Sequence, residues 1–230
     1  MRRKSFNIAI DGPAGAGKST IVKTVSARLG FIYVDTGAMY RALALYMLRR
    51  GIDPQDEEAV SKAVGGASVS ICHVDGAQHV MLDGEDVSGL IRTEEVGNTA
   101  SIVSAWPAVR AHLLSLQRDL AADHDVVMDG RDIGTCILPD ADLKIFLTAS
   151  SRVRAQRRCR ELTEKGAACN LEEIEQDIIE RDERDRNRAV APLRQAEDAV
   201  LIDSSALDVE EVLAAILQKA GERGLPSRTS

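Results

Sequence analysis

Near the start of the chain, residues 8–20 read IAIDGPAGAGKST, and this stretch decides the fold. The apolar run from Phe6 to Ile10 is short, as is typical of a buried β-strand, and it ends at Asp11. A glycine-rich turn follows, and a segment with helical periodicity begins at Ser19. The stretch therefore predicts a strand, a tight loop and a helix in direct succession.

The loop between strand and helix matches the pattern G-x-x-x-x-G-K-S. Its glycines let the backbone wrap closely around phosphate oxygens with N–H groups pointing inward, and the positive end of the helix adds attraction. Lys18 is expected to bridge the terminal phosphates of the nucleotide donor, and the Ser19 hydroxyl to bind Mg²⁺. GTPases, ATPases and small-molecule kinases share this loop, so it does not choose among them. The residues expected to hold the nucleotide donor are Gly12, Pro13, Ala14, Gly15, Ala16, Gly17, Lys18, Ser19 and Thr20.

Further short apolar runs repeat the strand pattern and alternate with helical segments. This alternation predicts an α/β fold of the P-loop NTPase type, with a central parallel sheet of about five strands that helices cover on both faces. The runs are Phe31–Val34, Val126–Met128, Leu143–Leu147 and Val200–Ile202.

Residues 65–95 differ from the rest of the chain in their pattern of apolar and polar residues. Apolar and polar positions alternate over Val69–Val74 and Val80–Leu82, and the turn-prone pair Asp75–Gly76 separates them. We interpret this part as a small antiparallel insert, and a surface elaboration without function stays open as an alternative. The core domain is then expected to comprise residues 1–64 and 96–220.

Two further features concern the C-terminal part of the chain. Asn170 can cap a long helix from Leu171 to Arg188, with Glu173 at the capping-box position. Residues 221–230 mix Gly, Pro, Ser and charged side chains, which predicts a disordered tail.

The overall composition is acidic, with 29 Lys and Arg residues against 36 Asp and Glu residues and a net charge of -7. This balance disfavours a broad nucleic-acid footprint or binding to an anionic membrane surface. The four cysteines are scattered without C-x-x-C spacing, which indicates neither a zinc site nor a disulfide framework. We therefore expect a cytoplasmic protein that binds neither nucleic acid nor membrane, and we expect it to be a monomer.

Three motifs lie outside the glycine-rich loop: DTGAMYR over residues 35–41, DGRD over residues 129–132 and RDERDRNR over residues 181–188. Together with the loop, they closely resemble the bacterial cytidylate kinase family, from about Asn7 to Gln218. The chain lacks the N-K-x-D motif of small GTPases and the L-S-G-G-Q signature of transporters. Adenylate kinases would carry an aromatic-proline-arginine run where this chain has Arg131 and Asp132.

The resemblance implies a role for each matching residue in binding CMP or dCMP. Arg41 and Arg131 would clamp the acceptor phosphate, because a guanidinium group binds phosphate in a bidentate manner. Asp132, with Ser101 and Arg110, would recognise cytosine, whose amino group donates to a carboxylate where uracil has a carbonyl. The positions that match acceptor-binding residues are Thr36, Tyr40, Arg41, Ser101, Arg110, Gly130, Arg131, Asp132, Arg181, Asp185 and Arg188.

The family also has a mobile lid, which corresponds here to residues 157–185, while the insert of residues 65–95 corresponds to its acceptor-binding part. The resemblance implies a catalytic set of Lys18, Arg131, Arg157, Arg181, Arg184 and Arg188. For the other arginines of this region we expect solvated faces with salt bridges to nearby acidic residues. These are Arg152, Arg154, Arg158, Arg160, Arg186 and Arg194.

The reaction expected from the resemblance is transfer of the γ-phosphoryl group of ATP to CMP or dCMP. Mg²⁺ would be held at Ser19, with Asp11 and Asp129 as outer-shell partners, and closure of the lid and the insert would exclude water. Three alternatives stay open. They are a kinase for UMP, dTMP or shikimate-like acceptors, a binding module that uses ATP as a switch, and a nucleic-acid binder, which the acidic balance disfavours.

Overall fold

The computed structural model describes residues 5–74, 77–164 and 166–225. Its core is a five-stranded parallel sheet with the strand order β2-β6-β1-β7-β8, which confirms the predicted α/β fold. The strands closely follow the apolar runs that predicted them. They are β1 (Asn7–Asp11), β2 (Ile32–Asp35), β6 (Val126–Gly130), β7 (Leu143–Thr148) and β8 (Val200–Asp203).

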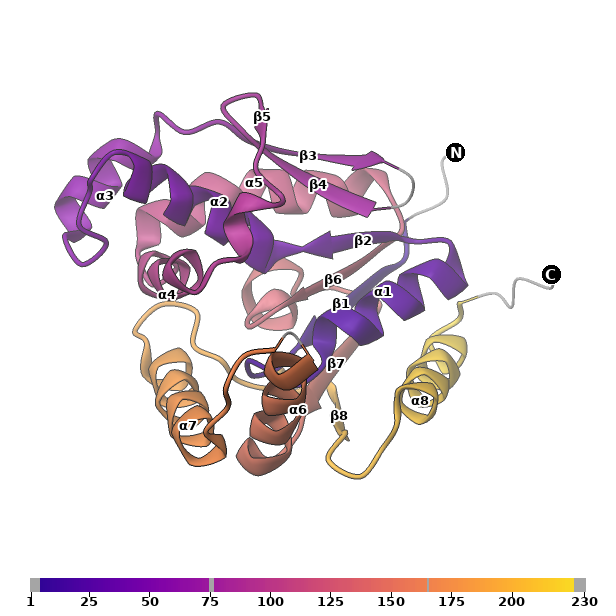
Figure 1. Cartoon of the computed structure of the whole chain (residues 1–230). Helices are drawn as coiled ribbons and strands as arrows, with labels where there is room; N and C mark the ends of the chain where they lie inside the picture. The colour runs from indigo at the N-terminus through magenta and orange to yellow at the C-terminus, as the bar shows by residue number, and fades with distance from the viewer. Residues whose placement is uncertain (1–4, 75–76, 165, 226–230) are drawn as a thin grey trace.

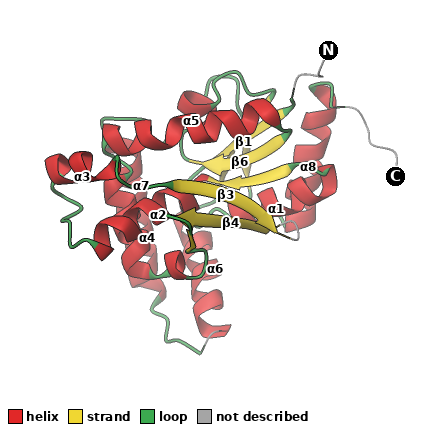
Figure 2. Cartoon of the chain, turned by 90° about the horizontal axis from the view of Figure 1, so that it is seen from above, coloured by secondary structure: helices red, strands yellow, loops and turns green. Residues whose placement is uncertain are grey.

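Helices pack on both faces of this sheet, α1 (Lys18–Leu29) and α8 (Val209–Glu222) on one and α2 (Thr36–Arg49) and α5 (Pro107–Asp123) on the other (Figure 1). In Figure 2, α1 and α8 lie side by side. Ile8 and Ile10 of β1 join the core under α1 and α8, whereas Ala9 joins the core under α2 and α5. Because both faces are covered, β1 is apolar at every position of this run.

The insert is a small antiparallel sheet of β3 (Val69–Val74), β4 (Ala77–Leu82) and β5 (Glu85–Asp86), which follows α3 (Glu57–Val64). It lies along β2, the edge strand of the core sheet. His73 Nε2 donates to the Tyr33 carbonyl oxygen at 3.1 Å, and the Gln78 amide bonds the Asp35 N–H and carbonyl at 2.8 and 3.3 Å. These bonds help cover the exposed edge of β2. The predicted turn at Asp75 and Gly76 lies outside the described residues.

From the insert, the chain returns to the core through η1 (Leu90–Arg92) and α4 (Glu94–Val103). Later in the chain, α6 (Ser151–Glu164) and α7 (Leu171–Asn187) pack side by side, in brown and orange in Figure 1. Asn170 caps α7 as predicted, because its Oδ1 accepts hydrogen bonds from the N–H groups of Glu172 and Glu173.

The cysteines differ from the expectation that no disulfide is present. Cys159 of α6 forms a disulfide with Cys169, which lies just before the start of α7, and their Cα atoms are 5.5 Å apart. That expectation is wrong for this pair because the turn between α6 and α7 brings together two residues that spacing rules treat as unrelated. Cys72 and Cys136 are free thiols.

At the C-terminus, α8 continues to Glu222, so it includes the first two residues of the segment predicted as a disordered tail. Residues 226–230 lie outside the described part of the chain. Within the described part, no helix has the length and apolar character needed to cross a membrane.

Candidate active site

The carboxyl ends of β1, β2 and β6 meet at one edge of the core sheet, where a single cavity of about 750 Å³ opens. Ligands of open α/β sheets bind at this edge, because the loops that leave neighbouring strands converge there. The glycine-rich loop lines one part of the cavity, and the rest is lined by residues of η1, α2, α4, α5, α6, α7, the segment after β6 and the segment from the end of β8 into α8. One cavity therefore contains both halves of the predicted site.

The glycine-rich loop has a backbone that only glycine fits. Gly12 has a φ of 153° and Gly15 a φ of 74°. A Cβ on Gly12 would lie 1.9 Å from the carbonyl oxygen of Leu147, so β7 leaves no space for a side chain. Gly17 precedes α1, and among the described residues no side chain caps this helix. The N–H groups of its first turn are thus available to an anion.

Lys18 is folded back over the loop. Its Nζ donates to the carbonyl oxygens of Gly12 and Pro13, at 2.7 Å in both cases, and the side chain is buried. Burial, with a contribution from the positive charge of Arg131, lowers the pKa of Lys18. A polyphosphate bound beside the ammonium group would raise this pKa again, since an opposite charge favours the charged form.

Ser19 and Asp129 form a candidate position for a divalent cation. Ser19 Oγ donates to Asp129 Oδ2 at 3.3 Å, and Asp129 Oδ1 is buried without a hydrogen-bond partner among the described residues. Burial and the nearby Asp35 raise the pKa of Asp129. An unpartnered carboxylate oxygen beside a hydroxyl fits Mg²⁺, which takes oxygen ligands and keeps several waters. In the described ranges, no group of three His, Cys, Asp or Glu side chains could hold a metal ion alone.

Within the described residues, the carboxylate of Asp11, unlike that of Asp129, accepts a hydrogen bond at each of its oxygens. Its Oδ1 accepts from the Ile133 N–H at 2.7 Å and its Oδ2 from the Gly134 N–H at 2.8 Å, at the start of the π-helical turn η2 (Ile133–Ile137). Burial raises the pKa of Asp11 to about 6. Asp11 therefore anchors the segment after β6, and both of its oxygens already accept backbone hydrogen bonds.

Unpartnered arginine atoms lie in the predicted acceptor pocket. Asp35 Oδ2 accepts from Arg41 at 3.2 Å and from Arg92 at 3.4 Å. The Nε atoms of Arg41 and Arg181 are buried and have no hydrogen-bond partner within the part of the chain that the structure describes. Burial lowers the pKa of both guanidinium groups. Buried donors without an acceptor fit an anionic ligand such as a phosphate group.

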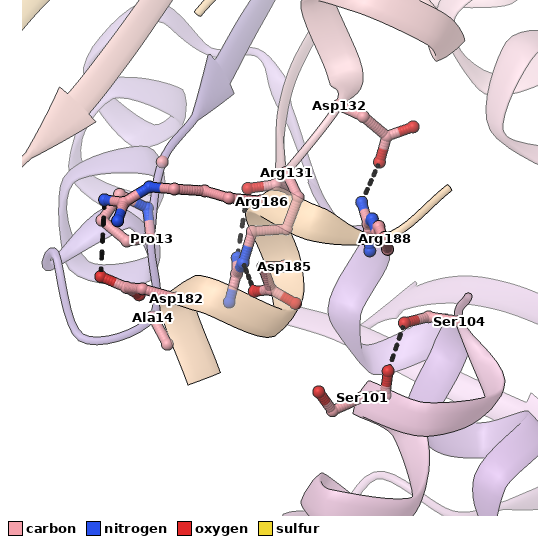
Figure 3. A network of polar contacts seen from close by, with 12 residues as sticks. Pro13, Ala14, Ser101, Ser104, Arg131, Asp132, Asp182, Asp185, Arg186 and Arg188 are labelled. Atoms are coloured by element: carbon pink, nitrogen blue, oxygen red, sulfur yellow. Dashed lines mark hydrogen bonds and ion pairs between the residues drawn. The ribbon is translucent and has the colours of Figure 1, made fainter. Parts of the chain in front are cut away.

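Asp132 is held between two arginines. Its Oδ1 accepts from Arg188 Nη2 at 3.4 Å, as Figure 3 shows, and its Oδ2 is paired with Arg110. Asp132 is only 3% exposed, and burial raises its pKa although both arginines oppose the shift. The Arg110 guanidinium also lies over the Tyr40 ring, 5.7 Å from its centroid. This carboxylate can accept an N–H group from a planar ligand in the cavity.

A second ion pair joins the segment after β6 to α7. Arg131 Nε donates to Asp185 Oδ2 at 3.0 Å, and both residues lie near the centre of Figure 3. Arg181 and Arg188, four residues before and three residues after Asp185, line the same cavity. Arg181 and Asp185 thus share one face of α7, and Arg188, the residue that follows the helix, reaches the same cavity.

The structure brings nearly all of the predicted residues to this cavity. Every predicted acceptor residue lines it, and so does the donor loop from Ala14 to Thr20. Arg157 also lines it and donates to the carbonyl oxygen and the hydroxyl of Ser204 at 2.7 and 3.2 Å. Arg184, in contrast, is exposed on α7 and is not among the residues that line the cavity.

Three arginines have positions that sequence reasoning missed. Arg92 and the exposed Arg160 line the cavity, although no motif singles them out. Arg154 was expected on a solvated face, but it is 4% exposed and paired with Asp182, so that expectation is wrong. The cause is tertiary packing against α7, which the charge pattern of α6 alone does not reveal.

Comparison with known proteins agrees with this geometry. The family model for cytidylate kinase matches residues 8–222. A cytidylate kinase of Desulfitobacterium hafniense is 51% identical over 215 residues, which cover 94% of this chain and 92% of that protein. A cytidylate kinase of Caldicellulosiruptor bescii is 50% identical over 215 residues, with 94% and 95% covered.

Among solved structures, an uncharacterized protein from Eubacterium ventriosum has a TM-score of 0.53 at 11% identity and covers 94% of this chain and 99% of that chain. This likeness supports the fold alone. The family model and the two bacterial relatives go further, because the model matches residues 8–222, a range that contains the loop and the acceptor motifs, and each relative is about half identical over 94% of this chain. The chain belongs to the cytidylate kinase family.

Proposed function

We propose that this protein transfers the γ-phosphoryl group of ATP to CMP or dCMP, which gives ADP and CDP or dCDP. The observation that carries the proposal is the buried carboxylate of Asp132, held by Arg110 and Arg188 in the same cavity as the donor loop. A carboxylate accepts a hydrogen bond from the exocyclic amine of cytosine, and arginine donates to its O2 and N3. Family membership supports both the donor and the acceptor.

In this proposal, the protein positions two polyanions and neutralises their charge. Arg41 and Arg131 bind the acceptor phosphate, and Arg181 and Asp185 contact the acceptor ribose. Lys18 turns from the loop carbonyls to the terminal phosphates of ATP. The acceptor phosphate has a second pKa of about 6, so near pH 7 it is mostly a dianion and attacks without a general base. The cationic side chains then stabilise the charge that spreads over the transferring oxygens.

Mg²⁺ fits at Ser19, with Asp129 as an outer-shell partner. When bound, it would neutralise charge on the β- and γ-phosphate oxygens of ATP. Ser19 supplies a hydroxyl ligand, and the unpartnered Asp129 Oδ1 can orient a coordinated water. Asp11 is a weaker candidate for this role because two backbone N–H groups occupy its oxygens.

Residues 157–185 are proposed to act as a lid and residues 65–95 as the acceptor-binding insert. Arg157 lies beside the donor loop, since its Nη1 is 3.8 Å from the position of a Cβ on Gly17. Closure of the lid would exclude water from the reacting phosphates. Arg184 is exposed in the structure and would reach the donor only through such closure.

The proposed partners are the nucleotides ATP, CMP and dCMP, bound by a monomer in the cytoplasm. The net charge of -7 argues against nucleic acid as a partner. In a cytoplasm, the cellular thiol pool would keep Cys159 and Cys169 largely reduced.

A coupled ADP-release assay over CMP, dCMP, UMP, dTMP, AMP and GMP tests the proposal. We expect CMP and dCMP to have much higher kcat/KM values than the other acceptors. Equal turnover of UMP or dTMP would instead favour a kinase of broader acceptor range. ATP binding without multiple turnover on any acceptor would favour a nucleotide-gated binding module.

A further inference from the structure

Arg154 is a buried arginine at which three parts of the protein meet. It binds Asp182 of α7 in a bidentate manner, with Nη1 3.1 Å from Oδ1 and Nη2 2.6 Å from Oδ2. Its Nη1 also donates to the carbonyl oxygen of Ala14 in the donor loop, and its Nε to that of Ala149 after β7, at 2.9 Å in both cases. Figure 3 shows Asp182 beside the loop at Pro13 and Ala14.

On the loop side, this contact fixes the direction of a peptide group. The peptide unit is planar and trans, so the carbonyl of Ala14 and the N–H of Gly15 point in opposite directions. Arg154 draws the Ala14 carbonyl toward itself and thereby turns the Gly15 N–H the other way, at a residue that lines the cavity. Arg154 therefore acts on the orientation of the N–H groups expected to hold the donor.

On the helix side, Asp182 stands among residues of the acceptor pocket. It follows Arg181 directly and precedes Asp185 by three residues, and both of these line the cavity. Asp182 itself is 3% exposed, and it pairs closely with Arg154 at 2.6 Å and more loosely with the exposed Arg186 at 3.8 Å. A shift of this part of α7 would therefore move Asp182 and its guanidinium partner together.

The buried pair is not the sole polar contact between α6 and α7 in the described part of the chain. Arg152, two residues earlier on α6, already bonds Glu172 and Glu175 of α7 at the surface. A buried ion pair adds little stability, because the loss of hydration offsets most of its Coulomb attraction. What Arg154 does and Arg152 does not do is contact the donor loop.

We propose that Arg154 and Asp182 are positioning residues that couple the donor site to the acceptor site. The inference rests on the proposed function, which assigns Arg181 and Asp185 to the acceptor. CMP bound against α7 holds Asp182 and Arg154 in place, and Arg154 holds the donor loop ready for ATP. By linkage, CMP strengthens the binding of ATP by the same factor as ATP strengthens the binding of CMP.

The coupling is measured by titration calorimetry with a non-hydrolysable ATP analogue, in the absence and presence of saturating CMP. The ratio of the two Kd values is the coupling factor, and we expect it to exceed 1 in the wild type. Arg154→Lys keeps the charge but cannot reach all three partners, and Asp182→Asn keeps the volume but loses the charge. In both variants we expect the factor to fall at least about twofold toward 1. Arg152→Gln, on the same helix, is the matched control and should keep the wild-type factor.

A coupling factor near 1 in the wild type, or an unchanged factor in folded Arg154→Lys and Asp182→Asn, overturns the inference. Weaker binding of the ATP analogue by these variants with an unchanged coupling factor also overturns the inference. Arg154 would then stabilise only the donor loop and would not couple it to the acceptor site. If a single variant does not fold, the double variant Arg154→Met with Asp182→Leu replaces the ion pair by apolar side chains and is measured in the same way. Turnover of CMP by the wild type reports separately on the proposed function, which can stand when the coupling is absent.

Discussion

The donor loop is one continuous stretch of chain, whereas the acceptor pocket collects side chains from α2, α4, α5, the segment after β6 and α7. The loop is proposed to bind ATP mainly through backbone N–H groups, so glycines at fixed positions determine its shape. The pocket is proposed to bind CMP through guanidinium and carboxylate groups, whose positions depend on how distant segments pack. The donor site is therefore a local property of the sequence, and the acceptor site is a property of the whole fold.

Lys18→Ala should have the largest effect, because Lys18 is the one side chain of the donor loop proposed to act on the transferring phosphate. We expect kcat to fall by at least about 100- to 1,000-fold, as for the loss of a preorganised group that stabilises transition-state charge. The KM for CMP should change little, since the acceptor pocket is built elsewhere. Steady-state kinetics measure both constants, and a melting curve checks that the variant is folded. A kcat within tenfold of the wild type would contradict the separation of the two sites.

Asp11 connects the donor loop to the acceptor pocket, because it directly precedes the loop and accepts hydrogen bonds from the turn that follows Asp132. Burial raises its pKa from 3.8 to about 6, so the folded state binds this proton more tightly than the unfolded state. Its contribution to stability is thus present below about pH 4 and is lost as the pH rises through 6. Relative to Asp11→Asn, the wild type should lose up to about 3 kcal/mol of unfolding free energy between pH 4 and pH 7.

Urea denaturation of the wild type and Asp11→Asn at several pH values measures this difference. Asp86 provides a control of opposite sign, because hydrogen bonds from Ser88 and His79 lower its pKa to about 2. Its stabilising contribution is lost as the pH falls, so the wild type should lose stability relative to Asp86→Asn on acidification. If the unfolding free energy of the wild type relative to Asp11→Asn stayed constant or increased with pH, burial would not raise the pKa of Asp11.

Asp132→Asn tests the acceptor side alone. The amide can present an N–H group to the carbonyl of uracil, so the kcat/KM preference for CMP over UMP should fall by about 5- to 150-fold, the equivalent of 1 to 3 kcal/mol. The KM for ATP should change little. Parallel kinetics with CMP and UMP measure the ratio, and Asp198→Asn, which breaks the Asp198 pair with Lys144, serves as a control. An unchanged ratio would show that Asp132 does not take part in base recognition.

Local signals in the sequence were enough for the core fold and the donor loop. Continuous apolar runs predicted the five strands because both faces of the sheet are covered. Asn170 predicted the start of α7 because capping depends only on the next few residues. The acceptor residues could be named only through their resemblance to a family. Nothing in their spacing shows that Arg110 meets Asp132.

Other features depend on tertiary contacts that the sequence does not reveal. Arg152, Arg154 and Arg158 carry the same charge on the same helix, yet only Arg154 is buried, because Asp182 lies against it from α7. The Cys159–Cys169 disulfide depends on the turn between α6 and α7.

The smallest expected effect concerns Arg157 and Arg184, the two arginines proposed for the lid. Their variants distinguish the structure as described from a closed form in which the lid covers ATP. Arg157 is already beside the donor loop, so Arg157→Gln should lower kcat/KM for ATP about tenfold, the cost of a hydrogen bond to a charged group. Arg184 is exposed outside the cavity, so Arg184→Gln should change this value much less. Kinetics of both variants at saturating CMP provide the comparison. If Arg184→Gln were as damaging as Arg157→Gln, closure of the lid would have to turn the outer face of α7 toward ATP.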